Sequence, residues 1–259
     1  MISFLLNAIK VIFLLGFLIL IHEGGHFLVA KLCKVRVNEF AIGFGKIMLQ
    51  KQGKETKYSL RMIPLGGFCS MEGEDEESDA QGSFSKASVW KRMAIVVAGA
   101  TVNIVFGILV YFILVSTVGI QFVNPAKDTM ANRIYYGAQG TGEFIKAVFD
   151  SIKSLFSGGL KTDQMVGIVG ISEVVVKTNG IINYLNLLAV ISVSLGVTNL
   201  LPIPALDGGK LLILIIEVIR RKPMKLETEA KIQLLGFSIL IALSLFVTYN
   251  DILRIGTGS

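Results

Sequence analysis

The stretch VIFLLGFLILIHEGGHFLVA, residues 11–30, joins a long apolar run to the only two histidines of the chain, His22 and His26. A helix of about 20 apolar residues crosses a bilayer, and this stretch has that length. Because positions i and i+4 of a helix share a face, both imidazoles can bind one Zn²⁺ ion while Glu23 between them activates the metal's water. The stretch therefore predicts a membrane-spanning helix with a zinc site near its middle.

The alternative is a pair of structural histidines, which would not require a carboxylate beside them. A carboxylate at the centre of a membrane helix costs about 2.5–3.5 kcal/mol, so acids within membrane spans mark functional sites by default. A metal ion at this site would offset the free-energy cost of placing Glu23 in the membrane. We also predict that this first apolar run is retained as a span and is not a signal peptide, because it lacks a basic start and a small-residue cleavage site.

The composition agrees with a membrane protein. Hydrophobic residues make up 53% of the 259 residues and charged residues only 17%, with a mean hydropathy of +0.67, whereas soluble domains carry about 25% charged residues. Four stretches are long and apolar enough to span a bilayer, at about residues 4–30, 93–118, 184–206 and 232–250. The predicted fold class is a polytopic α-helical membrane protein with four transmembrane helices.

Basic residues lie mainly in two connecting segments, which accounts for the net charge of +6 without nucleic acid. Residues 31–92 hold 8 Lys and 3 Arg, and residues 210–231 hold 4 Lys and 2 Arg, whereas residues 121–182 hold 5 Lys and 1 Arg. Since Lys and Arg concentrate on the cytoplasmic side, the first two segments are predicted to be cytosolic and both termini to lie outside. Cys33 and Cys69 are then predicted to be free thiols.

The segment after the first span is predicted to be β-rich, over about residues 34–70. It is rich in β-branched, aromatic and glycine residues, and residues 53–55 separate two runs that predict a hairpin. The sequence PLGGF at 64–68 is predicted to interrupt this pattern, and the acidic stretch 72–79 to be a mobile, solvated face. In the outer segment, residues 143–157 predict an amphipathic helix that lies on the membrane surface or packs against another helix.

A catalytic zinc ion needs a third protein ligand and an open position for water. The sequence has no third histidine, and Cys33 lies beyond the end of the span. The other acid within apolar sequence is Asp207, in NLLPIPALDGG at residues 199–209, where two prolines break the helix and two glycines allow a turn. Irregular backbone at membrane depth lies only against protein or a water-filled cavity. Asp207 is therefore the predicted third ligand, and the alternative is a helix-capping aspartate.

Two asparagines in apolar sequence have two interpretations each. The amide of Asn199 could hydrogen-bond an extended peptide backbone, or it could make a helix–helix hydrogen bond of the kind common in membranes. Asn103, within the second span, has the same two interpretations, and for this residue we favour packing.

Five motifs of the chain occur together in one known family. They are HEGGH at 22–26, GFG at 43–45, PLGGF at 64–68, AGATVN at 98–103 and NLLPIPALDGG at 199–209. With these motifs the chain resembles the site-2 protease family of intramembrane zinc metalloproteases, and the close match is to its RseP-like bacterial members. The resemblance covers nearly the whole chain. It implies an enzyme of the bacterial cytoplasmic (inner) membrane that hydrolyses peptide bonds of single-span membrane proteins, such as anti-sigma factors or remnant signal peptides, in regulated intramembrane proteolysis.

The resemblance also implies roles for individual residues. His22, His26 and Asp207 would hold Zn²⁺, and Glu23 would be the catalytic base, at a site toward the cytosolic side. The small β-rich loop would dip into the membrane and pair with the substrate. The residues expected beside the substrate chain are Asn199, Gly43, Gly45, Gly66 and Gly67.

The chain departs from RseP-like members in one respect, because these usually carry one or two PDZ domains between the second and third core spans. Residues 121–142 are too few for such a domain, so we predict a single membrane-embedded domain over residues 1–259 that lacks it. A rival interpretation is a metal transporter, but transporters predict two related halves with paired broken helices, and no repeat is seen. An inactive binding homologue is disfavoured because every expected ligand is present. The sequence makes no prediction about the oligomeric state.

Overall fold

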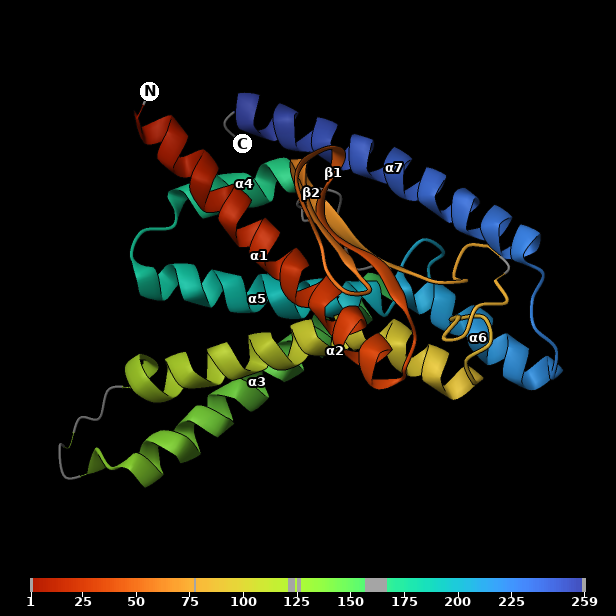
Figure 1. The fold of residues 1–259 in the computed structure, drawn as a ribbon. Coiled ribbons are helices and arrows are strands. Elements are labelled where there is room, and N and C mark those ends of the chain that lie inside the picture. The colour runs from red at the N-terminus through yellow and green to blue at the C-terminus, as the bar shows by residue number, and fades with distance from the viewer. Residues whose placement is uncertain (1, 77, 121–123, 125–126, 157–166, 258–259) are drawn as a thin grey trace. The chain divides into compact units, whose positions relative to one another are not determined.

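The computed structural model describes residues 2–76, 78–120, 124, 127–156 and 167–257 (Figure 1). Four of the described helices are long and apolar enough to cross a membrane: α1 (Ile2–Leu32), α2 (Val89–Leu114), α5 (Ile181–Asn199) and α7 (Leu226–Thr257). No proline interrupts these runs, and a helix satisfies its own backbone hydrogen bonds in lipid. The predicted polytopic helical class, with four spans, is confirmed.

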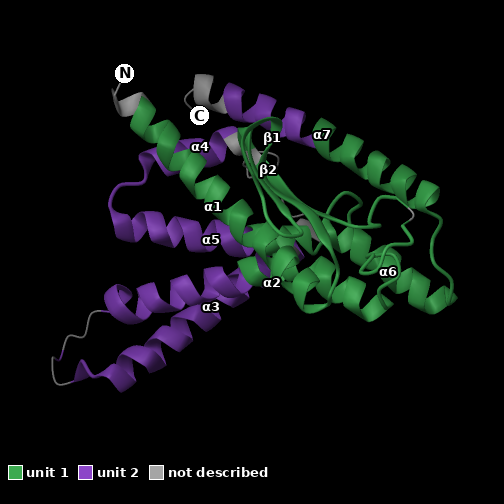
Figure 2. Cartoon of the chain, in the orientation of Figure 1, with its two compact units in different colours: residues 1–103, 195–242 green, residues 104–194, 243–259 purple. Residues whose placement is uncertain are grey.

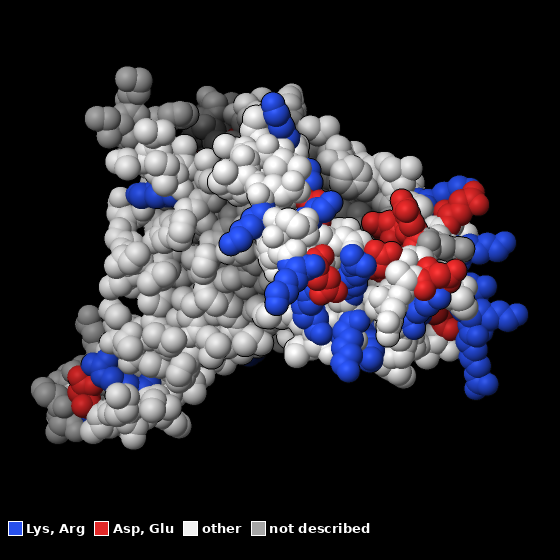
Figure 3. Space-filling view, in the orientation of Figure 1, with Lys and Arg blue, Asp and Glu red and all other residues white. Residues whose placement is uncertain are grey.

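Two compact units divide the described chain (Figure 2): residues 1–103 with 195–242, and residues 104–194 with 243–259. The first unit contains the HEGGH segment, the β-sheet and the loop that carries Asp207. Charged side chains gather over the sheet and the neighbouring loops of this unit (Figure 3). The first unit therefore holds all the residues predicted to act in catalysis.

The sheet of the first unit consists of two long antiparallel strands, β1 (Val37–Gln52) and β2 (Lys57–Met71). A hydrogen bond of 2.9 Å from Gly53 N to Thr56 O closes the turn between them, so the predicted hairpin is confirmed. The small β-rich region after the first span is thus present.

Both strands bend where glycine permits it. Gly43, Gly45 and Gly66 have positive φ angles of 87°, 81° and 135°, which side chains with a Cβ rarely adopt. Because of the bends, two different parts of β2 flank β1, and Ala41 pairs with Phe68 on one side and with Ser59 on the other. The prediction that residues 64–68 interrupt the strand is wrong, because Gly66 absorbs the bend and β2 continues.

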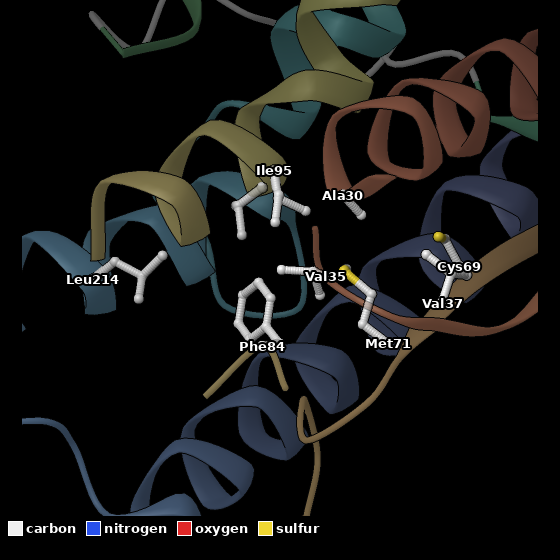
Figure 4. Close-up of a cluster of buried hydrophobic side chains, with 9 residues drawn as sticks. Ala30, Val35, Val37, Cys69, Met71, Phe84, Ile95 and Leu214 are labelled. Atoms are coloured by element: carbon white, nitrogen blue, oxygen red, sulfur yellow. The ribbon is translucent and has the colours of Figure 1, made fainter. Parts of the chain in front are cut away.

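A buried apolar cluster joins the sheet to the adjoining ends of α1 and α2 (Figure 4). Both cysteines are free, as predicted. Burial, with a further contribution from nearby carboxylates, raises the pKa of the Cys69 thiol to about 12, so this thiol is an unreactive core group. The cluster comprises Ala30, Val35, Val37, Cys69, Met71, Phe84, Ile95, Val96 and Leu214.

The third span is shorter than predicted, because α5 ends at Asn199 and not at Leu206. Pro202 and Pro204 lack the N–H donors that a continuing helix needs, and the chain turns. Asn199, a predicted substrate contact, is thus the last residue of α5, and the loop toward Asp207 follows it. A further helix, which was not expected in this basic segment, then follows as α6 (Asp207–Arg220).

In the second unit, the amphipathic helix predicted over residues 143–157 is the C-terminal half of a longer helix, and position 157 lies outside the described residues. Phe144 of this helix stacks on Tyr111 with ring centroids 4.2 Å apart, which favours the packing interpretation at this position. The unit's further elements are η1 (Val115–Gly119), α3 (Met130–Phe156) and α4 (Ile168–Lys177).

Candidate active site

The two histidines of α1 and Asp207 at the start of α6 converge on one point. His22 Nε2 lies 3.2 Å and His26 Nε2 lies 3.4 Å from Asp207 Oδ2, and the two Nε2 atoms are 3.3 Å apart. One helical turn separates the histidines, so their rings share a face, and both are buried. Among the described residues, these three form the only cluster of metal-binding side chains (His, Cys, Asp or Glu) that could hold a metal ion.

The three atoms have the spacing that a tetrahedral zinc ion requires. Zinc bonds of about 2.0–2.1 Å place neighbouring ligand atoms roughly 3.3–3.4 Å apart, close to the separations observed here. Apart from the two Nε2 atoms, the buried Asp207 Oδ2 has no hydrogen-bond partner among the described residues. A buried carboxylate oxygen of this kind needs a cation to offset its desolvation. The residues therefore fit Zn²⁺, and three protein ligands leave a fourth position for water.

The loop before α6 is packed tightly enough to fix Asp207. A Cβ on Gly208 or Gly209 would collide with carbonyl groups of the preceding loop, so only glycine fits there. Ala205 adopts a left-handed conformation, with a φ of 74°, and its N–H donates to the side-chain oxygen of Gln233 on α7. Because Ala205 lies close to Asp207 in the chain, this contact helps to hold the carboxylate in place.

The second nitrogen of each imidazole also has a neighbour. His26 Nδ1 donates to the carbonyl oxygen of Ile95 at 2.8 Å, and His22 Nδ1 lies 3.5 Å from the amide of Asn103. The Ile95 carbonyl favours the tautomer of His26 that leaves Nε2 free for a metal. The group that faces His22 Nδ1 is the amide nitrogen of Asn103, which is a donor, so the same tautomer of His22 requires the amide turned over to present Oδ1. Asn103 is fully buried. The packing role that we favoured for it is therefore incomplete, because the amide faces a predicted zinc ligand.

Replacing Asn103 with leucine should weaken zinc binding. The substitution removes the partner of His22 Nδ1, and loss of such outer partners typically costs 10–100-fold in metal affinity, so we expect a reduction of roughly that size. Competition with a chromogenic chelator measures the zinc affinity. Thr101→Val, at an exposed position of the same helix, is the matched control. Unchanged affinity in Asn103→Leu would assign Asn103 to helix packing alone.

Small residues let α1 and α2 approach closely at the site. A Cβ on Gly99 would collide with His26 Nε2, and a Cβ on Gly25 would lie 2.7 Å from the carbonyl oxygen of Ala98. No role for Gly99 was predicted from the sequence. The signal that could have found it is the run of small residues at 98–100, since small residues mark close helix contacts in membranes.

The side chain of Glu23 lies beneath the sheet. A Cβ on Gly67 would lie 3.1 Å from Glu23 Cγ, so β2 passes directly over the predicted base. The other three glycines expected beside the substrate, Gly43, Gly45 and Gly66, lie at the strand bends. Their positive φ angles account for glycine at these positions independently of any substrate.

Two adjoining polar cavities lie beside the site. The smaller, of about 300 Å³, is lined by Asp207 and by Glu74, Lys210 and Glu229. The last three residues also line the larger cavity, of about 620 Å³. Both cavities are large enough to admit water, and the charged groups in their walls can form hydrogen bonds with it.

The acidic stretch 72–79, predicted to be a mobile, solvated face, is anchored at two of its residues, while Asp75, Glu76 and Asp79 are exposed. Glu72 accepts hydrogen bonds from Ser78 (2.5 Å) and Asn38 (2.9 Å), and these bonds lower the pKa of its carboxyl group. Glu74 forms an ion pair of 2.6 Å with Lys210. Burial alone would lower the pKa of Lys210, but the Glu74 carboxylate raises it above its ordinary value. This pair ties the loop after β2 to α6.

An HExxH segment that places two buried histidines against an aspartate, in a chain with four span-length helices, is the arrangement of a membrane zinc metalloprotease. The sequence model of Peptidase family M50 matches residues 10–243, and the chain belongs to this family. The expected membership of the site-2 proteases, the enzyme class and the zinc cofactor are thereby confirmed.

Relatives match along nearly the whole chain. A Clostridium acetobutylicum protein named as a zinc metalloprotease is 30% identical over 95% of this chain and 97% of its own length. The regulator of sigma-W protease RasP of Bacillus subtilis is 25% identical over 97% of this chain and 99% of its own length. These alignments extend over 329 and 422 positions, compared with 259 residues here, so both relatives carry additional segments within the matched region.

Proposed function

We propose that this metalloprotease cleaves single-span membrane proteins within the bilayer or at its edge. The observation that carries the proposal is the depth of the candidate site. His22 and His26 lie on a span that extends from Leu5 to Leu32, so a scissile bond has to reach them at membrane depth. We propose anti-sigma factors or remnant signal peptides as substrates, in regulated intramembrane proteolysis. The name of the Bacillus relative, a regulator of sigma-W protease, supports the first of these.

In this proposal His22, His26 and Asp207 hold Zn²⁺, which when bound polarises the scissile carbonyl and lowers the pKa of its water to about 7. Glu23 accepts a proton from the attacking water and delivers it to the leaving amine nitrogen. The water oxygen adds to the carbonyl carbon, and the C–N bond breaks as the amine takes up the proton. Glu23 ends the cycle ionised, as it began.

We propose that the substrate segment is held extended, because a helix keeps its peptide bonds within its own hydrogen-bond ladder. β2 passes over Glu23 at Gly67, so a strand lies next to the proposed base and can pair with an extended peptide. Asn199, at the end of α5, supplies an amide to the substrate backbone. The residues that shape the strands for this pairing are Gly43, Gly45 and Gly66.

We also propose the bacterial cytoplasmic membrane as the location, with both termini outside and the site toward the cytosol. The excess of Lys and Arg in residues 31–92 and 210–231 supports this orientation. The relatives named above are bacterial proteins. Their additional internal segments agree with a compact chain that lacks a PDZ domain.

Cleavage of a single-span test substrate by the purified protein tests the proposed function. Glu23→Gln should lower the rate by about 10²–10⁴-fold, because it removes the proton carrier, while zinc content stays the same. Glu143→Gln, at an exposed position of α3, is the control and should cleave normally. Equal cleavage by wild type and Glu23→Gln would refute the role of Glu23. Product masses that place the cut outside the membrane segment would refute intramembrane cleavage.

A further inference from the structure

We propose that the sheet carries a binding site for one acidic phospholipid, formed by an apolar groove and the lysines of the hairpin turn. This site is separate from the proposed proteolysis and uses none of the residues assigned to it. Three observations carry the proposal: the groove, the charge beside it, and the level of the turn relative to the first span.

The groove has a volume of about 470 Å³ and lies on the two strands. Its apolar lining comes from Phe40, Ile42, Leu49 and Leu60, and Lys51 and Tyr58 also line it. Leu49 is 68% exposed, so this apolar surface lacks a protein cover in the described chain. In a membrane protein, an open apolar groove beside a lysine suits an acyl chain with a phosphate at its end.

Positive charge is concentrated around the turn. Residues 51–57 contain Lys51, Lys54 and Lys57, all exposed, and none of the three has an ion-pair partner in the described chain. The one acid in this segment, Glu55, is paired with Lys31 at 2.7 Å. Lys57 also interacts with the carboxylate of Glu39, which is itself paired with Arg61. The turn still carries a net positive charge, and a phosphate group is complementary to it.

The turn is fixed near the end of the first span. Lys31 lies in the last turn of α1, and the span ends at Leu32. The ion pair to Glu55, together with a hydrogen bond of 2.8 Å from Thr56 Oγ1 to Val37 O, holds the turn at this end. Lipid headgroups lie at the ends of membrane spans, so the turn lysines are at the level of the phosphates.

These features select an acidic lipid over a substrate peptide as the occupant. An apolar substrate segment would fill the groove but would leave the net positive charge of the turn without a counter-charge. A phospholipid with a net negative headgroup satisfies the groove and the lysines together. Because each basic residue near an anionic membrane surface contributes roughly a fivefold factor in affinity, three of them give a strong preference over zwitterionic lipid.

Native mass spectrometry of the purified full-length protein tests this site by counting bound phosphatidylglycerol and phosphatidylcholine. Wild type should prefer phosphatidylglycerol, and the variant Lys51→Gln/Lys54→Gln/Lys57→Gln should bind it at least tenfold more weakly while its binding of phosphatidylcholine is unchanged. The control Arg220→Gln/Arg221→Gln/Lys222→Gln removes three other exposed charges and should behave as wild type.

Covalent labelling provides the second measurement. Phosphatidylglycerol with a photoactivatable acyl chain should label residues 40–60 in wild type. Equal phosphatidylglycerol affinity in wild type and the triple lysine variant would overturn the proposal, as would labelling confined to other segments. Protection of the groove by a transmembrane substrate peptide, with no protection by the lipid, would overturn it as well, because the groove would then be a substrate site.

Discussion

Replacing Asp207 with alanine should leave the protein folded but unable to retain zinc or cleave substrate. Asp207 Oδ2 lies 3.2 Å from His22 Nε2 and 3.4 Å from His26 Nε2, so the substitution leaves two imidazoles of a three-ligand set. Removing a residue that only hydrogen-bonds to a metal ligand already lowers metal affinity about 10–100-fold, so removing the ligand itself should lower it further. Elemental analysis after dialysis should find one zinc ion in wild type and almost none in Asp207→Ala.

Glu229→Gln is the matched control for this substitution. Glu229 lines the same small cavity as Asp207 but is not part of the group that converges on one point. The control should keep both zinc and proteolysis, and thermal unfolding should be similar in the two variants. Retention of stoichiometric zinc by Asp207→Ala would mean that another residue is the third ligand.

The local part of this site could be predicted from the sequence. Helix geometry alone brings His22 and His26 together, because residues four positions apart share a face. Asp207 is distant in sequence, but the free-energy cost of an acid in apolar surroundings singled it out, and the structure places its carboxylate beside both imidazoles. Both inferences depend on polar residues that stand within long apolar stretches, and such positions can be seen directly in the sequence.

The contacts between helices could not be predicted in the same way. A membrane span is apolar on its lipid face and on its protein face, so the sequence of α2 does not reveal that Gly99 and Asn103 face the histidines. The strand error at residues 64–68 has a similar origin. Proline and glycine usually mark the end of a strand, and only the backbone conformation at Gly66 shows that they produce a bend here.

Substituting Gly99 with alanine should abolish zinc binding, although Gly99 is not itself a ligand. The added Cβ would collide with His26 Nε2, the atom that faces Asp207, and would lie 2.9 Å from the carbonyl oxygen of His22. Neither contact can be relieved by a flexible side chain, since one involves a ring and the other the backbone of α1. The imidazole or the helix has to shift, and either shift breaks the three-ligand spacing. Zinc content and cleavage rate measure the loss.

The two adjacent glycines of HEGGH provide the control and should respond in opposite ways. Gly25→Ala puts a Cβ 2.7 Å from the carbonyl oxygen of Ala98, so it should push α1 and α2 apart and lower zinc retention. Gly24→Ala meets nothing within 4 Å and should keep its zinc, with unfolding at the same or a higher temperature because alanine favours a helix by about 1 kcal/mol. If Gly99→Ala retained zinc as well as Gly24→Ala does, close packing of α2 against α1 would not determine the ligand geometry. Loss of zinc in Gly99→Ala and Gly25→Ala, with retention in Gly24→Ala, would attribute the loss to helix packing, because all three substitutions add the same methyl group.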